Sequence, residues 1–462
     1  MPWYSGITGY QWLVLTIASL GWIFDVFEGQ LLLSSEKQML GDLVGASTAE
    51  STKELYKNLA LAAFLAGGAL GGVVFGALAD RIGRVRTMTI TILMYSLFTC
   101  LTAAAQTWWQ VVVLRFLVAL GVGGEWAVAS ALVAEVFPPR ARAWSGAIFH
   151  GSSVLGTYLA VAAGTFIVND PEWGWRWAFA IGAAPALLTL WIRWQLREPE
   201  IWLASGQRQP PGGATPGASD TDQGGDAARP SSFLVRLGEL FAPGIAGRTL
   251  LGFSLAVIGL ATFWGVHIHG KELMLRRARS TYEQGAGLTA SATESQRQAV
   301  WQQHEEELKS SEMLGMFLTT TGGGLGLLAF GPIGEWLGRR WAFVVFHLGG
   351  LAVGLLTFLV YRLCTPTVLG GLLVLFGFWT LGMHAGYAIY FPELFPTRLR
   401  SLGAGFCFNF ARITTAAMLV MSGYLQRAGV PLETSAMALS LLFVVGVIVA
   451  WNGPETKGTT LA

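Results

Sequence analysis

The strongest constraint on this chain is the repeated occurrence of apolar stretches long enough to cross a lipid bilayer. A transmembrane helix needs about 20 mostly apolar residues, and twelve stretches of the 462-residue sequence meet that length. Asp, Glu, Lys and Arg make up 13% of the residues, whereas soluble domains carry roughly 25%. We therefore predict an all-α membrane protein whose twelve transmembrane helices span residues 10–34, 58–80, 86–105, 109–134, 143–168, 176–197, 247–270, 312–334, 341–361, 367–392, 402–424 and 434–452.

Composition and motifs exclude several kinds of function. The formal net charge of +2 is too small for a nucleic-acid binding surface, so no nucleic-acid partner is expected. The three cysteines lie far apart in apolar segments, and no Cys/His spacing fits a metal site. No phosphate-binding loop, dinucleotide fingerprint or catalytic-triad motif is recognisable. We therefore expect no enzyme activity, no cofactor and no metal.

The chain divides at a segment that cannot bury a core. Residues 204–232 contain no Val, Ile, Leu, Met or aromatic residue, a composition typical of a flexible linker. This segment predicts three parts: a six-helix half at 1–203, the linker, and a six-helix half at 233–462. Residues 231–241, at the end of the linker, have the pattern of a short amphipathic helix lying on the membrane surface.

The distribution of Lys and Arg predicts an orientation. Most of them fall in loops on the side of the two termini, and short loops rich in these residues remain in the cytoplasm. We expect a multi-pass protein of the inner or plasma membrane with both termini cytoplasmic. The long loop 271–311 then lies outside, where residues 297–309 fit a helix. A plain solvated surface and a role as a lid or partner site are both open for that helix.

The two halves repeat each other at their helix ends. The pattern Glu-x2-Pro-x3-Arg begins at Glu135 and again at Glu393, 258 residues later. A loop motif of Gly, acid, Gly and Arg follows the second and the eighth span at an offset of 255 residues. Duplicated halves are typical of secondary transporters. The glycine runs at 66–72 and 321–326 fall within predicted helices, and we interpret them as packing positions.

These motifs resemble those of the major facilitator superfamily. GALADRIGRVR at 76–86 is similar to the loop signature between its second and third helices. Residues 21–30, 115–142 and 390–413 are similar to helices of the proton symporters for metabolites, aromatic acids, sialate and monocarboxylates. The resemblance implies the major facilitator fold and secondary active transport by alternating access.

The resemblance also implies an inner gate latch at the helix ends. A role in topology alone is the competing interpretation, because arginines at helix ends also anchor at lipid headgroups. Trp336 stands where the first half has Arg81, which weakens the gate argument for the second half. The predicted gate residues are Gly76, Asp80, Arg81, Gly83, Arg84, Glu135, Arg142, Glu335, Gly338, Arg339, Glu393 and Arg400.

Three acids lie well inside predicted spans, away from the span ends, where an ionisable group is costly and is a functional candidate. Asp25 and Glu28 are three residues apart, on one face of a helix, and Glu125 lies in a glycine-rich stretch. Two like charges in a low-dielectric site favour retention of a proton by one of them. We therefore predict proton coupling at these three acids. A structural pair with Arg115, at similar depth, and a packing role for Glu125 are the alternatives.

Arg412, near the centre of a predicted span, is the principal candidate for substrate binding. Its guanidinium offers a planar fork that matches a carboxylate. Arg115, Asn409 and His384 are the further substrate-binding candidates. The alternatives are a pair between Arg412 and a neighbouring helix, and for His384 an ordinary role as a core residue.

Together these features predict a transporter that uses the proton gradient. We expect it to be a monomer in the bilayer that moves a small organic anion, a carboxylate, together with protons. A symporter of a neutral metabolite or sugar on the same fold is the first alternative. A non-transporting membrane receptor or binding protein is the alternative of another class.

Overall fold

The computed structural model describes residues 2–45, 48, 50–168, 174–204, 233–289, 291–414 and 430–461. All regular secondary structure in these residues is helical. Ten helical segments are long and apolar enough to cross a membrane, and they coincide with ten of the predicted spans. These segments are Gly9–Val44, Leu55–Ile82, Arg84–Thr102, Trp108–Val136, Pro139–Val168, Ala246–Gly285, Glu305–Leu337, Arg339–Val360, Pro366–Leu394 and Glu433–Trp451.

The two remaining predicted spans are not seen as single long helices. The span at 176–197 is formed by two shorter helices with a turn at 182–184 between them. The span at 402–424 extends into residues 415–429, which lie outside the described residues. The all-α membrane fold is confirmed, whereas the count of twelve spans stays a prediction.

The helices follow one another with short connections. Before the predicted linker they are α1 (Gly9–Val44), α2 (Glu50–Ile82), α3 (Arg84–Thr102), α4 (Trp108–Val136), α5 (Pro139–Gly151), α6 (Ser153–Ala163), η1 (Gly164–Val168), α7 (Gly174–Ile181), α8 (Pro185–Gln195) and α9 (Glu200–Ala204). After it they are α10 (Phe233–Glu239), α11 (Ala246–Thr262), η2 (Phe263–His267), α12 (Ile268–Gly270), α13 (Leu273–Gly285), α14 (Glu294–Gln303), α15 (Glu305–Leu337), α16 (Arg339–Val360), α17 (Pro366–Gly382), α18 (His384–Leu394), η3 (Thr397–Leu399), α19 (Arg400–Gly405), η4 (Phe406–Phe410), α21 (Leu432–Ser440) and α22 (Leu442–Trp451).

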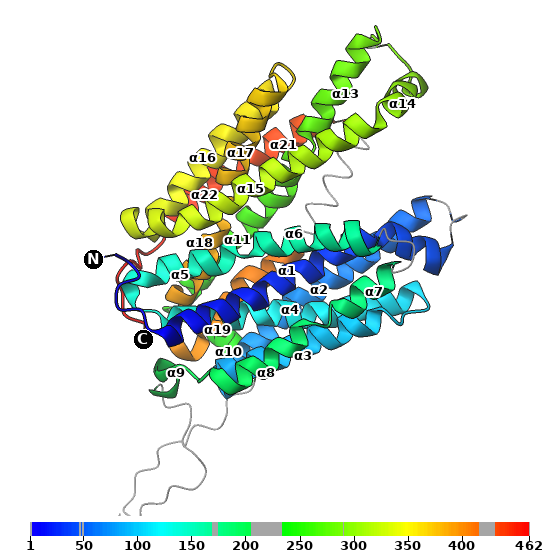
Figure 1. Ribbon diagram of the computed structural model, residues 1–462. Helices are drawn as coiled ribbons and strands as arrows, with labels where there is room; N and C mark the ends of the chain where they lie inside the picture. The colour runs from blue at the N-terminus through cyan, green and yellow to red at the C-terminus, as the bar shows by residue number, and fades with distance from the viewer. Residues whose placement is uncertain are drawn as a thin grey trace, which may run out of the picture.

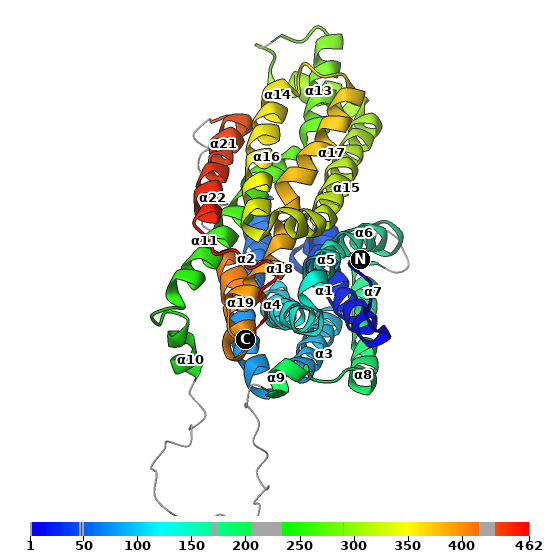
Figure 2. The same cartoon turned by 90° about the vertical axis from the view of Figure 1, so that its left-hand side faces the viewer.

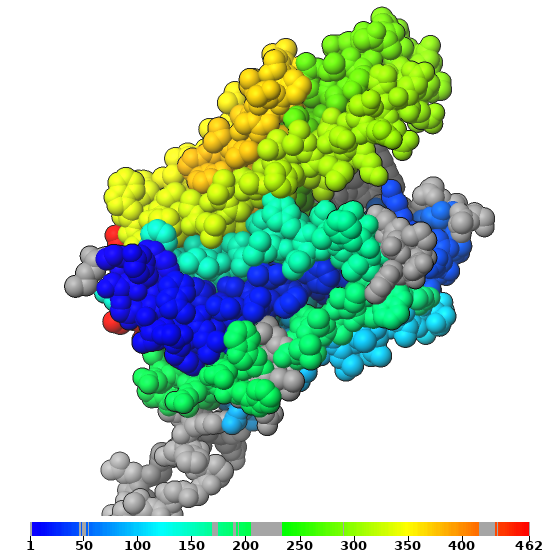
Figure 3. All heavy atoms as spheres, viewed as in Figure 1, coloured from blue at the N-terminus to red at the C-terminus, as the bar shows by residue number. Residues whose placement is uncertain are grey.

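The helices form a bundle with both ends of the chain at one end of it (Figure 1). α1–α8 lie in one layer and α15–α17 with α21 and α22 in another, as the turned view also shows (Figure 2). Packing between the layers runs through α2 against α19 and η4, and through α5 against α15 and α18. On the face drawn as spheres, α15 lies along α5 and α6 (Figure 3). We call the end with the chain termini the terminal end and the other the distal end.

Glycines bring two helix pairs into backbone contact, as the glycine runs predicted. A side chain at Gly71 would overlap the carbonyl oxygen of Leu120, so α2 and α4 approach too closely for any other residue. Gly326 makes the equivalent contact with the carbonyl of Phe378 between α15 and α17. Gly71 and Gly326 are 255 residues apart, which is the offset of the loop motif. The repeat therefore extends from the loops into the packing of both halves.

At the distal end, α13 and α14 extend beyond the bundle (Figure 1). α14 begins at Glu294 after a capping box formed by Thr293 and Gln296, and it ends at Gln303. The single helix predicted at 297–309 is therefore two helices. The helical backbone is interrupted at His304, and the residues that follow belong to α15. At the terminal end, α10 forms within the segment predicted to be amphipathic, whereas residues 205–232 of the predicted linker lie outside the described residues.

Gly326→Ala should lower the melting temperature of the purified protein, because its Cβ would overlap the backbone of α17. Overpacking of this kind costs about 1–3 kcal/mol. The matched control is Gly371→Ala on α17, where an added Cβ meets nothing within 4 Å. Thermal unfolding in detergent measures both, and equal melting temperatures would refute the role of Gly326 in helix packing.

Candidate functional site

A network of arginines and glutamates joins the two halves at the terminal end. Arg84 donates two hydrogen bonds to Glu135, from Nε at 3.1 Å and from Nη2 at 2.8 Å. Arg400, from the other half, donates to the same carboxylate from Nη1 at 2.6 Å. All three side chains are fully buried, and the single carboxylate of Glu135 is shared between an arginine of its own half and one of the other.

The second half builds the same arrangement with the roles exchanged. Arg339 donates to Glu393 from Nε at 3.2 Å and from Nη2 at 3.1 Å. Arg142, from the first half, lies 3.6 Å from the same carboxylate. The predicted latch residues are thus brought together as two related triads, each of which crosses between the halves.

Asp80 breaks the symmetry between the triads. Its carboxylate accepts the backbone N–H groups of Ser401 and Leu402 at 3.1 and 3.0 Å. These N–H groups lie in the first turn of α19, where the helix dipole favours a negative charge. The counterpart Glu335 has a 29% exposed side chain and pairs with Arg339 of its own half at 3.0 Å. The inter-half contact of the motif's acid therefore belongs to the first half, as the motif's departure at Trp336 suggested.

Two glutamates outside the predicted set hold the loops in shape. Glu198 accepts the backbone N–H groups at the start of α3, and Glu455 accepts those at the start of α16. Gly83 and Gly338 precede these helices with φ of +113° and +92°, and a side chain at either would overlap the capping carboxylate. Glu198 and Glu455 are 257 residues apart, so the internal repeat was the signal that could have found them.

Two further residues of the predicted gate, Gly76 and Arg81, lie outside the triads. A Cβ at Gly76 would lie 2.7 Å from the carbonyl oxygen of Ser401, so this glycine permits the approach of α2 to α19. Arg81 is exposed and makes no polar contact with the described residues. The structure does not bring Arg81 into the latch, and a role for it stays a prediction.

A second cluster of charged side chains is buried deeper in the bundle. Arg115 on α4 forms an ion pair with Glu28 on α1 and donates a hydrogen bond to Thr102 at 3.2 Å. Its guanidinium lies 5.0 Å from the ring centroid of Phe179. Arg115 and Glu28 are 0% and 2% exposed. The structural pair that the sequence left open is present, and Glu28 is the acid that forms it.

Asp25 and Glu125 have no basic partner within 4 Å among the described residues. Asp25 is 1% exposed and neither of its oxygens accepts a hydrogen bond. Glu125 contacts the hydroxyl of Thr91 at 3.2 Å, and its other oxygen has no partner. That oxygen packs against Gly21, one helical turn before Asp25. The hydroxyl of Tyr95 lies beside Asp25 and is unpaired as well.

Arg412 faces this pair of acids from the other half. Its guanidinium packs on Gly68 of α2, where a Cβ would lie 2.5 Å from Nη1, and it lies 5.5 Å from the ring of Phe408. Asp25 is its acidic neighbour, but no carboxylate among the described residues lies within ion-pair distance of it. Arg412 is half-buried and available to a further anion.

The two other substrate-binding candidates are engaged in packing. Asn409 donates from Nδ2 to the carbonyl of Gly123 at 3.0 Å, which leaves its Oδ1 buried and unpaired. His384 donates from Nε2 to the carbonyl of Gly259 at 3.2 Å. Neither side chain presents a donor to an open space.

A histidine and two aromatic rings that the sequence reasoning undervalued join the halves beside Arg412. Trp126 of α4 stacks on Phe408 of η4 with ring centroids 4.0 Å apart. The indole N–H of Trp126 donates to Nδ1 of His150 at 3.2 Å. Since indole is only a donor, Nδ1 of His150 is the acceptor and its proton is on Nε2. No periodicity marks such residues, because they come from three different helices.

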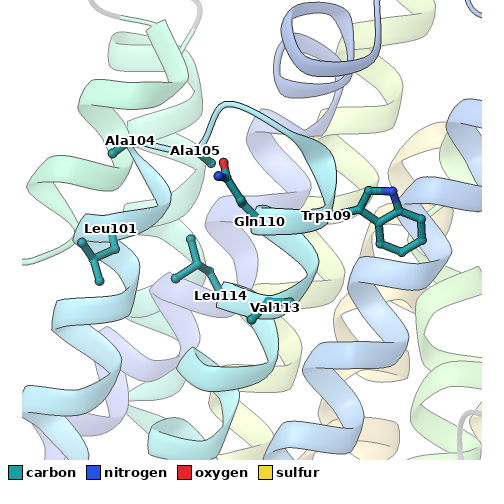
Figure 4. A pocket seen from close by; sticks show the side chains of 7 residues that line it. All are labelled: Leu101, Ala104, Ala105, Trp109, Gln110, Val113 and Leu114. Atoms are coloured by element: carbon teal, nitrogen blue, oxygen red, sulfur yellow. The ribbon is translucent and has the colours of Figure 1, made fainter.

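A cavity of about 510 Å³ at the turn between α3 and α4 is separate from this cluster (Figure 4). Leu101, Trp109 and Val113 line it and are exposed on the outer surface of the bundle. A surface of this kind suits lipid chains, so the cavity does not belong to the charged site.

The fold and motifs agree with comparisons to known proteins. A sequence model described as Major Facilitator Superfamily matches residues 10–290. The chain belongs to this superfamily. It is therefore a multi-pass membrane transporter rather than an enzyme, and the resemblance inferred from its motifs is confirmed.

Relatives of this transporter match it over most of their length. A putative metabolite transport protein of Haemophilus influenzae is 27% identical over 98% of this chain and 99% of its own. A probable 4-methylmuconolactone transporter of Cupriavidus pinatubonensis is 28% identical over 85% and 80%. The sialic acid transporter NanX of Escherichia coli is 26% identical over 96% and 95%. These relatives lie in the metabolite and organic-acid branch of the superfamily.

Solved structures confirm the fold of the transporter. The proton:xylose symporter XylE of E. coli superposes with a TM-score of 0.69 over 98% of both chains, at 16% identity. At a sequence identity of 16%, this similarity supports the fold and not a shared substrate.

Asp80→Asn should open the terminal end of the transporter. The asparagine oxygen can accept from one of the two backbone N–H groups, but its NH2 group faces the other and cannot accept from it. The variant therefore loses a hydrogen bond to a charged group, which contributes about 1.5–3 kcal/mol. The ratio of closed to open molecules should therefore fall at least roughly tenfold. Pulsed spin-label distance measurements between labels at the exposed positions Glu200 and Trp336 report the opening.

Glu335→Gln is the matched control for this experiment. It removes the corresponding acid of the second half, whose ion pair stays within that half, and should leave the distance distribution unchanged. If both variants open the terminal end equally, the contact of Asp80 with α19 does not hold the latch.

Proposed function

We propose that this transporter carries a small organic carboxylate together with protons by alternating access. The observation that carries the proposal is the unpaired arginine, Arg412, beside two unpaired carboxylates, Asp25 and Glu125. Buried charges are normally paired because taking an ion out of water costs several kcal/mol. Unpaired ones inside a membrane protein are therefore candidates for the transported ions and their carriers.

The hydrogen-bond surroundings of Glu125 are compatible with both its charged and its protonated form. Thr91 has one hydroxyl proton, and its oxygen lies 2.9 Å from the carbonyl of Met88, which can only accept. The same hydroxyl lies 3.2 Å from Oε2 of Glu125 and can donate to that carboxylate. When the hydroxyl donates to Met88 instead, its oxygen can accept from the protonated acid. Proton uptake at Glu125 is thus supported by a neighbour that can accept its hydrogen bond.

Charge balance supplies the coupling between proton and substrate. With both acids ionised, the field at Arg412 is reduced by Asp25 and an incoming carboxylate is repelled. Protonation of Asp25 or Glu125 removes that repulsion and leaves Arg412 to bind the substrate carboxylate. The substrate and the proton each favour binding of the other, and this reciprocity is the requirement for symport.

Glu28 has a different role from the other two acids in this proposal. Its ion pair with Arg115 is neutral as a unit, so Glu28 orders the site without carrying the transported proton. Arg115 in turn is occupied and is the weaker candidate for the substrate anchor. The pair reduces the predicted proton sites from three acids to two.

An anion is a better candidate substrate than a neutral sugar. A guanidinium can donate hydrogen bonds to a neutral sugar. Only an anion, however, both balances its charge and, as a carboxylate, forms a bidentate pair with it. The names of the relatives, which include a sialic acid transporter and a probable methylmuconolactone transporter, support the same class.

The orientation follows from the distribution of arginines. The terminal end carries both latch triads and the exposed Arg81, and we propose that it faces the cytoplasm. The distal end, with α13 and α14, then faces outward. Opening and closing of the latch would expose the buried charges to one side of the membrane at a time.

Asp25→Asn and Glu125→Gln should each abolish substrate accumulation driven by a pH gradient in proteoliposomes. Exchange of substrate for substrate needs no net proton movement and should survive in at least one of them. The control is the double variant Glu28→Gln/Arg115→Gln, which removes the ion pair as a unit and should retain proton-driven accumulation. Normal accumulation in both single variants would move the proton site elsewhere.

Arg412→Lys should weaken binding of carboxylate substrates by roughly 1.5–3 kcal/mol, or about 10- to 150-fold in Kd, because it keeps the charge and loses the planar fork. Arg412→Ala should weaken it further. Calorimetry on the purified variants measures the affinity for a panel of benzoate, muconate and sialate. Neutral xylose is the discriminating control. Unchanged carboxylate affinity in a folded alanine variant would contradict the assignment.

A further inference from the structure

A pocket at the distal end brings together cationic side chains from both halves. Its volume is about 550 Å³, within the range of small-molecule sites. Lys37 enters it from α1, Arg279 from α13, Trp301 from α14 and Lys309 from α15. We call this pocket, with these four residues, the outer site; Figure 1 shows α13 and α14 beyond the bundle at that end.

We infer that the outer site binds small carboxylates with a planar, unsaturated body before they reach the buried charges. The inference rests on the proposed function, because it assigns an outer binding step to the same class of substrate. It adds a second site, built from residues that take no part in the buried cluster.

The cations of the outer site lack acidic partners. Arg279 lies 4.4 Å over the ring of Trp301, and its Nε is buried without a hydrogen bond. Neither Lys37 nor Lys309 forms an ion pair with any described residue. A carboxylate in the pocket can therefore be bound by cations that are not engaged in ion pairs with described residues.

The flat surface of the site is held in place by neighbours. The indole N–H of Trp301 donates to Glu283 at 3.1 Å, and Glu283 is paired with Arg297. These contacts fix Trp301 under Arg279 before any ligand arrives. A planar ligand can stack on such a surface while its carboxylate meets the cations, and this combination selects unsaturated acids over aliphatic ones.

The binding expected here is weak, as a transit site requires. Glu305 and Glu312 line the same pocket and offset part of its positive charge. Lys37 lies nine residues beyond Glu28 on α1, about 14 Å along the helix axis. The outer site thus lies on the helix that carries the acids of the buried cluster, toward the solvent.

Protection of a cysteine tests binding at this site directly. Gln302 lines the pocket and is exposed, so Gln302→Cys, in the full chain with Cys100, Cys364 and Cys407 replaced by alanine, accepts a membrane-impermeant thiol reagent. The reagent is added outside intact cells, so labelling also tests the proposed orientation. Benzoate should slow the labelling, whereas its neutral counterpart benzamide and the aliphatic acetate should not.

Variants of the cations supply the decisive comparison. Arg279→Gln should remove the protection by benzoate, and Arg276→Gln should retain it. Arg276 is three residues away on α13, is paired with Glu272 and does not line the pocket. Lys37→Gln is an exposed substitution that leaves the Arg279 stack intact, and it should also weaken protection.

Transport kinetics separate this inference from the proposed function. For a panel carboxylate that the unaltered protein transports, KM for uptake should rise roughly 3- to 10-fold in Arg279→Gln and Lys37→Gln with kcat retained. Efflux of substrate loaded on the inside should be unchanged.

Several outcomes would overturn the inference. They are equal protection by benzoate and benzamide, protection that survives Arg279→Gln, an uptake KM that does not change in either variant, and an equal effect of Arg276→Gln. Absence of carboxylate transport in the unaltered protein would instead overturn the proposed function, and the inference with it.

Discussion

Two crossed arginine–glutamate triads at the terminal end hold the halves of this transporter together. In each triad one glutamate binds an arginine of its own half and one of the other, so Glu135 and Glu393 are shared across the boundary. A glutamate buried this deeply is stable only while it keeps an oppositely charged partner. Loss of the inter-half arginine leaves the intra-half pair intact, and each half can therefore move away as a unit without unfolding.

The charges at mid-depth obey the opposite rule. Arg115 and Glu28 neutralise each other, but Asp25, Glu125 and Arg412 have no oppositely charged side chain within 4 Å among the described residues. An internal duplication explains why they are exceptional. At the offset of the Glu-x2-Pro-x3-Arg motif, which also relates Leu120 to Phe378, Glu125 corresponds to Met383, Arg115 to Leu373 and Arg412 to Val154. The repeat therefore supplies the packing and the latch, and departures from it supply the charges that a transporter can use.

The asymmetry reaches the latch as well. Asp80 binds the first turn of α19, whereas Glu335 remains within its own half and is partly exposed. A transporter with identical halves would open equally readily at either triad. The additional contact of Asp80 gives the first-half loop a connection that the second-half acid lacks. In the proposed mechanism, binding of proton and substrate near α1 and α4 would act on helices that lead directly to this connection.

The sequence by itself determined the helical membrane fold, ten of the spans that the structure contains, the repeat and the glycine packing. It also singled out the arginines and glutamates that the structure brings together in the two triads. These follow from local patterns, because hydrophobic length, periodicity and motif spacing are properties of neighbouring residues. Only the tertiary structure decided that Glu28, and not Asp25, pairs with Arg115, that Glu198 and Glu455 cap the helices behind Gly83 and Gly338, and that Arg279 and Trp301 meet Lys37 in one pocket. Each of these contacts joins helices far apart in the chain, and whether two side chains on different helices meet depends on the rotation and depth of both, which no pattern along a single helix records.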